Sequence, residues 1–148
     1  MKILITILTL ISLTLYGAVD RYDNRDIIIN VQMIEKISQD LTGKSYVKIY
    51  DPALTPDMRS YMSKGSIVAS CEHADIVIVN SINQVESKCM NKTVLVTRYN
   101  LLSQVEQAVG ALYWQKGRPN LLFLKGRLGS RGIALGNDYS PYIEEKLY

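Results

Sequence analysis

The chain has 148 residues, of which 47% are hydrophobic and 21% are charged, a composition that is typical of one ordinary globular domain. This excludes a disordered or collagen-like chain, and the length is enough for one hydrophobic core. The 17 basic and 14 acidic residues give a formal net charge of +3, which is too small and too mixed to indicate a nucleic-acid-binding protein.

The first 18 residues have the features of an export signal. Lys2 precedes an uncharged stretch, Ile3 to Val19, in which isoleucine and leucine alternate with hydroxyl side chains. This stretch is shorter than the roughly 20 apolar residues of a membrane-spanning helix. We expect export to the periplasm, cleavage near Gly17 or Ala18, and a mature domain over residues 19–148. The alternative is an uncleaved N-terminal membrane anchor.

The next segment predicts a helix, a strand and a second helix. Apolar residues at helical spacing predict a helix over about residues 25–41, which Gly43 ends. Tyr46 to Tyr50 is rich in β-branched and aromatic residues and predicts a strand. Thr55-Pro56-Asp57 combines an N-cap, a proline at the first helical position and an acid in the first turn. It therefore predicts a helix that ends at Gly65.

Two apolar runs, Ala74 to Val79 and Thr93 to Thr97, predict strands that are buried on both faces, as in a parallel sheet. Ser81 with Gln84 forms a capping box, which predicts a short helix between them. Ile67 to Ala69 predicts a further short strand. A parallel crossover needs about a dozen residues, and too few separate this strand from the next one. It is therefore either antiparallel to its sequence neighbour or an edge strand placed elsewhere.

The region after the second apolar run predicts a helix followed by a strand. A start at Asn100 or Ser103 and apolar residues at helical spacing up to Tyr113 predict a helix that stops at Lys116. Leu121 to Leu124 then predicts a strand.

The C-terminal stretch predicts a loop and a short helix. We interpret the glycines of residues 126–136 as loop glycines, and Ser140-Pro141 predicts a last short helix. Taken together, the elements predict a single α/β domain with a mostly parallel sheet of four to five strands flanked by helices.

The two cysteines precede the two buried strands. If these strands are parallel neighbours, Cys71 and Cys89 lie at the same amino-terminal edge of the sheet, where strands about 4.8 Å apart suit a disulfide. In an oxidising compartment we expect a disulfide between Cys71 and Cys89. The alternative is a metal site of both cysteines with His73 and Met90. That set has no fixed fourth ligand, so we expect neither a metal nor a cofactor.

Known catalytic constellations are absent from the sequence. His73 is the only histidine, and there is no GxSxG elbow, GxGxxG motif or P-loop. Glu144 and Glu145 are adjacent, so they cannot face each other across a glycosidic bond. We therefore expect a protein that is not an enzyme.

Polar and basic side chains follow the predicted strands at their carboxyl ends, where open α/β sheets bind ligands. Five basic residues and no acidic residue lie between Glu106 and Asp138, so the charge is segregated along the chain. This favours a site for an anionic ligand or an acidic partner, and a solvated loop face is the alternative. The second surface to consider is the first helix around Gln32 and Lys36. The predicted site residues are Asn80, Ser81, Arg98, Asn100, Lys125 and Arg127.

The leading helix and the strands YVKIY, ADIVIV and TVLVT, the last followed by a polar turn, resemble the YfiR-like periplasmic regulators. The resemblance covers roughly Ile27 to Leu135. It implies a small periplasmic protein that binds the periplasmic part of a membrane diguanylate cyclase and restrains it, with cysteines that tune stability. It also implies a β-hairpin over Gly110 to Leu124, with its turn at Lys116-Gly117-Arg118, where the capping signals predict a helix.

These observations predict an exported, non-catalytic regulatory or interaction module that restrains a membrane-bound signalling protein. The alternative is a periplasmic binding protein for a small anion, with a concave pocket lined by Asn80, Ser81, Arg98 and Asn100. The sequence does not determine the partner, the ligand, the strand order or the oligomeric state.

Overall fold

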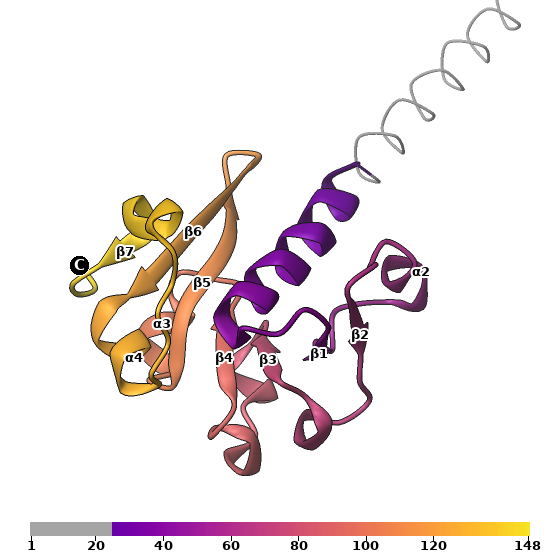
Figure 1. Cartoon of the computed structure of the whole chain (residues 1–148), viewed down its shortest axis with the longest axis horizontal. Helices are drawn as coiled ribbons and strands as arrows, with labels where there is room; N and C mark the ends of the chain where they lie inside the picture. The colour runs from indigo at the N-terminus through magenta and orange to yellow at the C-terminus, as the bar shows by residue number, and fades with distance from the viewer. Residues whose placement is uncertain (1–24) are drawn as a thin grey trace, which may run out of the picture.

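A seven-stranded sheet in the order β2-β1-β3-β4-β5-β6-β7 organises the computed structural model, which describes residues 25–148 (Figure 1). Strands β1 to β5 are parallel, β6 is antiparallel to β5, and β7 is parallel to β6. The expected α/β class with a mostly parallel sheet is confirmed, although the sheet has more strands than expected. The proposed signal peptide lies outside the described residues.

The strands are short except for the hairpin. Their bounds are β1 Val47–Tyr50, β2 Gly65–Ile67, β3 Ile76–Val79, β4 Thr93–Val96, β5 Ala108–Gln115, β6 Arg118–Leu124 and β7 Ile143–Glu144. The described part of the N-terminal helix covers residues 25–42, as the apolar spacing predicts. The other helices are α2 Pro56–Arg59, α3 Leu101–Gln104 and α4 Lys125–Ser130, and the 3-10 turns are η1 Cys71–His73, η2 Ile82–Gln84, η3 Ser87–Cys89 and η4 Asn137–Tyr142.

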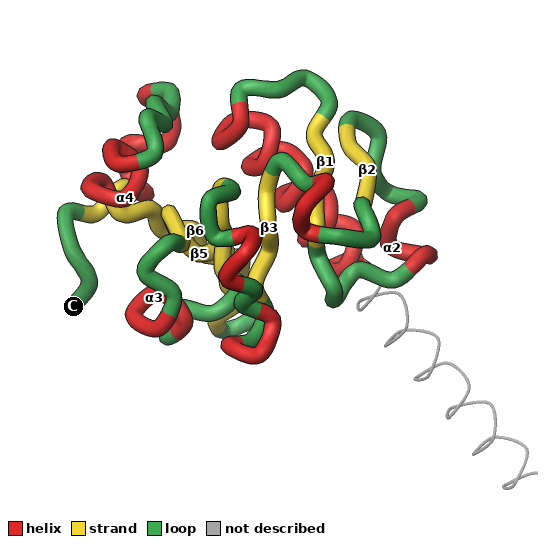
Figure 2. Tube along the Cα trace, turned by 90° about the horizontal axis from the view of Figure 1, so that it is seen from below, coloured by secondary structure: helices red, strands yellow, loops and turns green. Residues whose placement is uncertain are grey.

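The sheet is covered on both faces, which is why β3, and β4 after Thr93, are apolar (Figure 2). On one face the N-terminal helix and α4 pack against the strands, with Ile34, Ile37 and Leu41 of the helix in a core with Ile49 and Phe123. On the other face α3 and the 3-10 turns η1 and η3 cover a second core that includes Val77, Val94 and Leu102.

The disulfide between Cys71 and Cys89 is present, with a Cα separation of 5.9 Å. The two cysteines lie in η1 and η3, directly before β3 and β4, as the sequence predicts. Closing a loop of this length stabilises a fold by about 3 kcal/mol. The bonded sulfur atoms cannot serve as thiolate ligands, so the alternative metal set of Cys71, His73, Cys89 and Met90 loses its two thiolate donors.

The short strand before Cys71 lies at the edge of the sheet. Residues Gly65–Ile67 form β2, which pairs in parallel with β1 and does not pair with β3. Of the two arrangements expected for this strand, the edge position away from its sequence neighbour is therefore correct.

The preceding helix α2 begins with the predicted Thr55 N-cap but ends at Arg59. Beyond it, Glu35 of the N-terminal helix accepts hydrogen bonds from the backbone N–H groups of Ser63 and Lys64 and holds the turn into β2.

The helix predicted up to Lys116 is wrong. Only residues Leu101–Gln104 are helical, and the segment that follows forms the β5–β6 hairpin. Lys116 and Gly117 both have positive φ angles, which is typical of a tight hairpin turn that matches the twist of the strands. Residues Ala108 to Leu112 of β5 are buried on both faces and the pairing of β5 with β4 shifts register near Val109, so the apolar residues of β5 do not alternate.

Two smaller expectations at the C-terminus are also wrong. Residues Lys125–Ser130 form the short helix α4 where a glycine loop is expected. The last short helix expected from Ser140-Pro141 is instead the 3-10 turn η4, followed by strand β7. Strand β6 lies beside β7, and hydrogen bonding along this edge is more favourable than one isolated turn of helix.

Gly110 provides a test of the hairpin packing. A Cβ atom at Gly110 would overlap the carbonyl oxygen of Leu122, so Gly110→Ala forces the two strands apart. We expect a loss of about 1–3 kcal/mol in the free energy of unfolding, measured by urea denaturation. Gly126→Ala in α4 is the matched control because a Cβ there meets nothing within 4 Å. Equal stability of the two variants would contradict this packing.

Candidate interaction site

Three polar side chains meet where the order of the strands reverses. Chain order runs from β1 outward to β2 and then back to β3 on the other side, so the carboxyl ends of β1 and β3 flank the switch point. The Asn80 side chain donates through Nδ2 to Asp51 Oδ1 at 2.9 Å, and Thr97 Oγ1 donates to Asn80 Oδ1 at 2.9 Å. This network joins the ends of three neighbouring strands.

Asp51 is the least exposed member of the network, at 4% exposure. Burial raises its pKa, and the hydrogen bonds from Asn80 and from the backbone N–H of Ala53 partly offset this effect. Asp51 Oδ1 accepts both of these hydrogen bonds and Asn80 Oδ1 accepts the one from Thr97, so these two oxygen atoms are used within the protein. A carboxylate at the centre of this edge also repels an anion.

The neighbouring predicted residues lie around this network. The side chain of Gln84 accepts hydrogen bonds from the backbone N–H groups of Asn80 and Ser81, so Ser81 belongs to the expected capping box. Arg98 and Asn100 are exposed beyond the carboxyl end of β4. Four of the six predicted site residues thus lie at this edge of the sheet.

The other two predicted site residues do not lie there. Because β6 is antiparallel to β5, Lys125 and Arg127 follow β6 at the opposite edge of the sheet. Lys125 forms an exposed ion pair with Glu145 at 2.9 Å. Arg127 Nη1 donates to the carbonyl oxygens of Val105 and Ala108, both at 3.0 Å, and burial lowers its pKa. The expected convergence of all six residues is therefore wrong.

A second arginine satisfies carbonyl groups at the same edge. Arg131 donates to the carbonyl oxygens of Met90, Asn91 and Lys92, directly after the disulfide cysteine Cys89. Arg127 and Arg131 therefore attach α4 to two separate loops at the amino-terminal edge of the parallel strands. Their guanidinium groups have a structural role in this arrangement.

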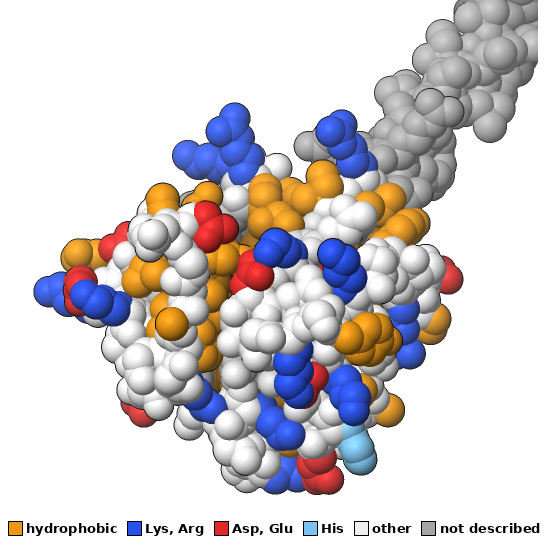
Figure 3. Space-filling view, viewed as in Figure 1, with side chains coloured by type: hydrophobic (Ala, Val, Ile, Leu, Met, Phe, Trp, Pro, Cys, Tyr) orange, Lys and Arg blue, Asp and Glu red, His pale blue; other side chains and the backbone are white. Residues whose placement is uncertain are grey.

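An apolar groove of about 740 Å³ lies on the face of the sheet that carries the N-terminal helix. Its wall on the helix side repeats at helical spacing through Ile29, Met33 and Ile37, and Gln32 and Lys36 lie at its rim. Figure 3 shows hydrophobic side chains gathered between this helix and the C-terminal part of the chain. The residues that complete the groove are Pro119, Asn120, Leu121, Asp138, Tyr139 and Tyr142.

Side-chain hydrogen bonds fix the walls of this groove. Trp114 of the hairpin donates through Nε1 to Asn30 Oδ1 of the N-terminal helix at 3.0 Å. The hydroxyl of Tyr139 donates to Asp40 of the same helix, and its ring packs edge-on against Phe123 at 5.8 Å. Burial and the contact with Asp40 raise the pKa of Tyr139, so the hydroxyl keeps its proton. The groove is thus preformed in the absence of a bound partner.

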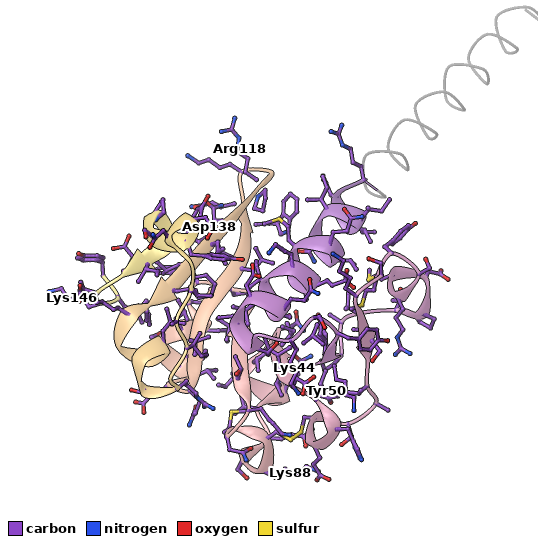
Figure 4. The ribbon with its side chains drawn as sticks, viewed as in Figure 1. Lys44, Tyr50, Lys88, Arg118, Asp138 and Lys146 are labelled. Carbon is purple, nitrogen blue, oxygen red and sulfur yellow. A yellow bond between two sulfur atoms is a disulfide. The ribbon has the colours of Figure 1, made fainter. Side chains whose placement is uncertain are left out.

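The turn of the hairpin adds positive charge beside the groove. Lys116 and Arg118 are exposed and line a neighbouring cavity of about 400 Å³ together with Gln115 and Asn120. Asn120 borders both cavities. Figure 4 shows Arg118 projecting at one end of the molecule, with Lys88 and the disulfide at the opposite end. The apolar groove therefore has a cationic end.

The groove contains few ionisable groups. Its ionisable groups are Lys36, Asp138 and two tyrosines, and Lys36 forms an ion pair with Asp40 at 2.8 Å. These groups include no serine, cysteine or histidine to serve as a nucleophile with its base. The second surface considered from the sequence, around Gln32 and Lys36, is part of this groove. Pro119, Tyr139 and Tyr142 were missed because no local pattern links them.

Comparisons with protein-family models, with curated proteins and with solved structures gave no match. Within residues 25–148, no helix is both long enough and apolar enough to cross a membrane.

Replacing Arg127 tests its structural role. Arg127→Ala leaves the carbonyl oxygens of Val105 and Ala108 without their charged donor, so we expect a loss of about 1–3 kcal/mol in the free energy of unfolding. Lys125→Ala removes the same charge from an exposed ion pair and should cost less than about 1 kcal/mol. Urea denaturation of both variants measures the difference. If both lose the same small amount, Arg127 does not hold these loops.

The pKa of Asp51 predicts a pH effect. A carboxyl whose folded pKa is raised contributes stability that is complete below its unfolded pKa of 3.8 and is lost as the pH rises through the folded pKa. Asp51→Asn retains an oxygen acceptor for Ala53 and Asn80 and does not ionise. The melting temperature of the variant relative to the wild type should therefore be higher at pH 8 than at pH 4. If the difference in melting temperature between the variant and the wild type is equal at both pH values, the raised pKa of Asp51 does not affect stability.

Proposed function

We propose that the protein is an exported, non-catalytic interaction module that restrains a membrane-bound signalling protein. The observation that carries this proposal is the preformed apolar groove between the N-terminal helix and strand β6. Exposed apolar surface is unfavourable in water, so burial of this groove by a partner contributes favourable free energy to the complex. Hydrogen bonds from Trp114 and Tyr139 hold the walls, which lowers the entropy lost on binding.

Export and the membrane partner have separate support. The apolar stretch from Ile3 to Val19 has the composition of an export signal, and a disulfide is stable in an oxidising compartment. The identity of the partner class is taken from the resemblance to the YfiR-like regulators alone. We place the function in the periplasm for these reasons.

The alternative function, a binding protein for a small anion, has less support from the positions of the predicted site residues. Lys125 and Arg127 lie at the other edge of the sheet, and the carboxylate of Asp51 lies beside Asn80. Of the three basic residues predicted for the anion site, Arg98 is then the one that lies at the carboxyl edge of the parallel strands.

Affinity capture under oxidising conditions tests the proposed function. The full chain is immobilised and exposed to detergent-solubilised membranes of the cell that produces it. We expect one integral membrane signalling protein to be retained, and the activity of that protein to fall when the purified module is added. The control is the same chain after reduction and denaturation, which should retain nothing specifically. Failure to enrich a membrane protein above this control, or enrichment without any effect on its activity, would contradict the proposal.

A further inference from the structure

We propose that the groove receives an amphipathic helix of the partner, with the apolar face of that helix against Met33 and Leu121 and with acidic residues opposite Lys116 and Arg118. This inference rests on the proposed function and names the chemistry of the partner segment.

The length of the groove suits three residues on one face of a helix. Ile29 and Ile37 are eight positions apart on the N-terminal helix, which corresponds to about 12 Å at 1.5 Å per residue. Apolar residues at positions i, i+4 and i+7 of a partner helix span about 10.5 Å. Three such side chains therefore fit along the wall that Ile29, Met33 and Ile37 form.

The charges around the groove determine what lies beside the apolar face. Lys116 and Arg118 are exposed at the hairpin end. Asp138 also lines the groove, and Lys36 farther along the N-terminal helix is paired with Asp40. Acidic side chains of a partner are therefore attracted electrostatically to these two cations of the turn, whereas the charge of Lys36 is already paired within the protein. Basic side chains near the turn would be repelled.

The shape of the groove disfavours a lipid surface as the occupant. The apolar residues are recessed between the N-terminal helix and the η4 segment, and Met33 and Leu121 are only partly exposed. A bilayer surface is broad and meets projecting side chains first, whereas a single helix can enter a groove.

Selection of displayed helical peptides tests the inference without knowledge of the partner. A library of helical peptides is selected on the immobilised full chain, purified with its disulfide intact, and binding of the enriched peptides is followed by the fluorescence of Trp114, the only tryptophan. We expect enriched peptides with apolar residues at i, i+4 and i+7 and with acidic residues near one end.

Three variants connect binding to the groove. Met33→Lys places a charge in the apolar wall and should weaken binding at least about tenfold. Tyr142→Lys, at a side chain that is 45% exposed, gives the same test without disturbing the core if Met33→Lys fails to fold. Arg118→Glu should weaken binding about three- to tenfold at low salt and less at high salt. The matched control is Arg59→Glu in α2, which changes the charge equally and should leave binding unchanged.

Three results would overturn the inference. They are enrichment of basic or extended peptides, binding that survives both Met33→Lys and Tyr142→Lys, and binding of the chain to anionic vesicles of phosphatidylcholine and phosphatidylglycerol in place of any peptide. The proposed function is judged separately. If membrane capture succeeds and is unaffected by the groove variants, the module has a partner but binds it elsewhere; if capture itself fails, the function is wrong.

Discussion

Burial of the N-terminal helix against one face of the sheet is the interaction on which the rest of the structure depends. Ile34, Ile37 and Leu41 are each less than 5% exposed and pack into the core that spans β1, β3 and β6. Burying side chains of this size contributes about 1.5–3 kcal/mol each. Without the helix this face of the sheet would be open to water, and the groove would have no wall. The contacts of the helix with Trp114 and Tyr139 then set the position of the hairpin and of the C-terminal segment.

The fold uses several of the polar groups at the two edges of the sheet. At the carboxyl edge, Asp51 and Asn80 bind each other, and at the amino-terminal edge Arg127 and Arg131 bind backbone carbonyls. Groups that are satisfied in this way have little to offer a ligand. The apolar groove beside the cations of one turn is a different kind of surface, and it supports the proposed interaction module more than the alternative of a binding protein for a small anion.

Local patterns account for what was predictable from the sequence. The first helix, the strands β3 and β4 and the disulfide follow from short runs of residues and from the distance between neighbouring strands. The β5–β6 hairpin does not, because the first part of β5 is buried on both faces and its apolar residues also fit helical spacing. The position of Arg127 depends on the direction of β6, which no local signal carries. The groove combines Met33, Leu121 and Tyr142, which are far apart in the chain, so only the part around Gln32 and Lys36 was anticipated.

Native-state hydrogen exchange tests the central claim most directly. If the N-terminal helix and the sheet form one cooperative unit, the backbone amides of Val31 to Leu41 should open with the same free energy as those of Ile76 to Val79, at the value for global unfolding. Exchange of the helix amides at a free energy near zero, while the β3 amides stay protected, would contradict it. The helix would then detach without unfolding the sheet, and the groove would not be a preformed feature of the protein.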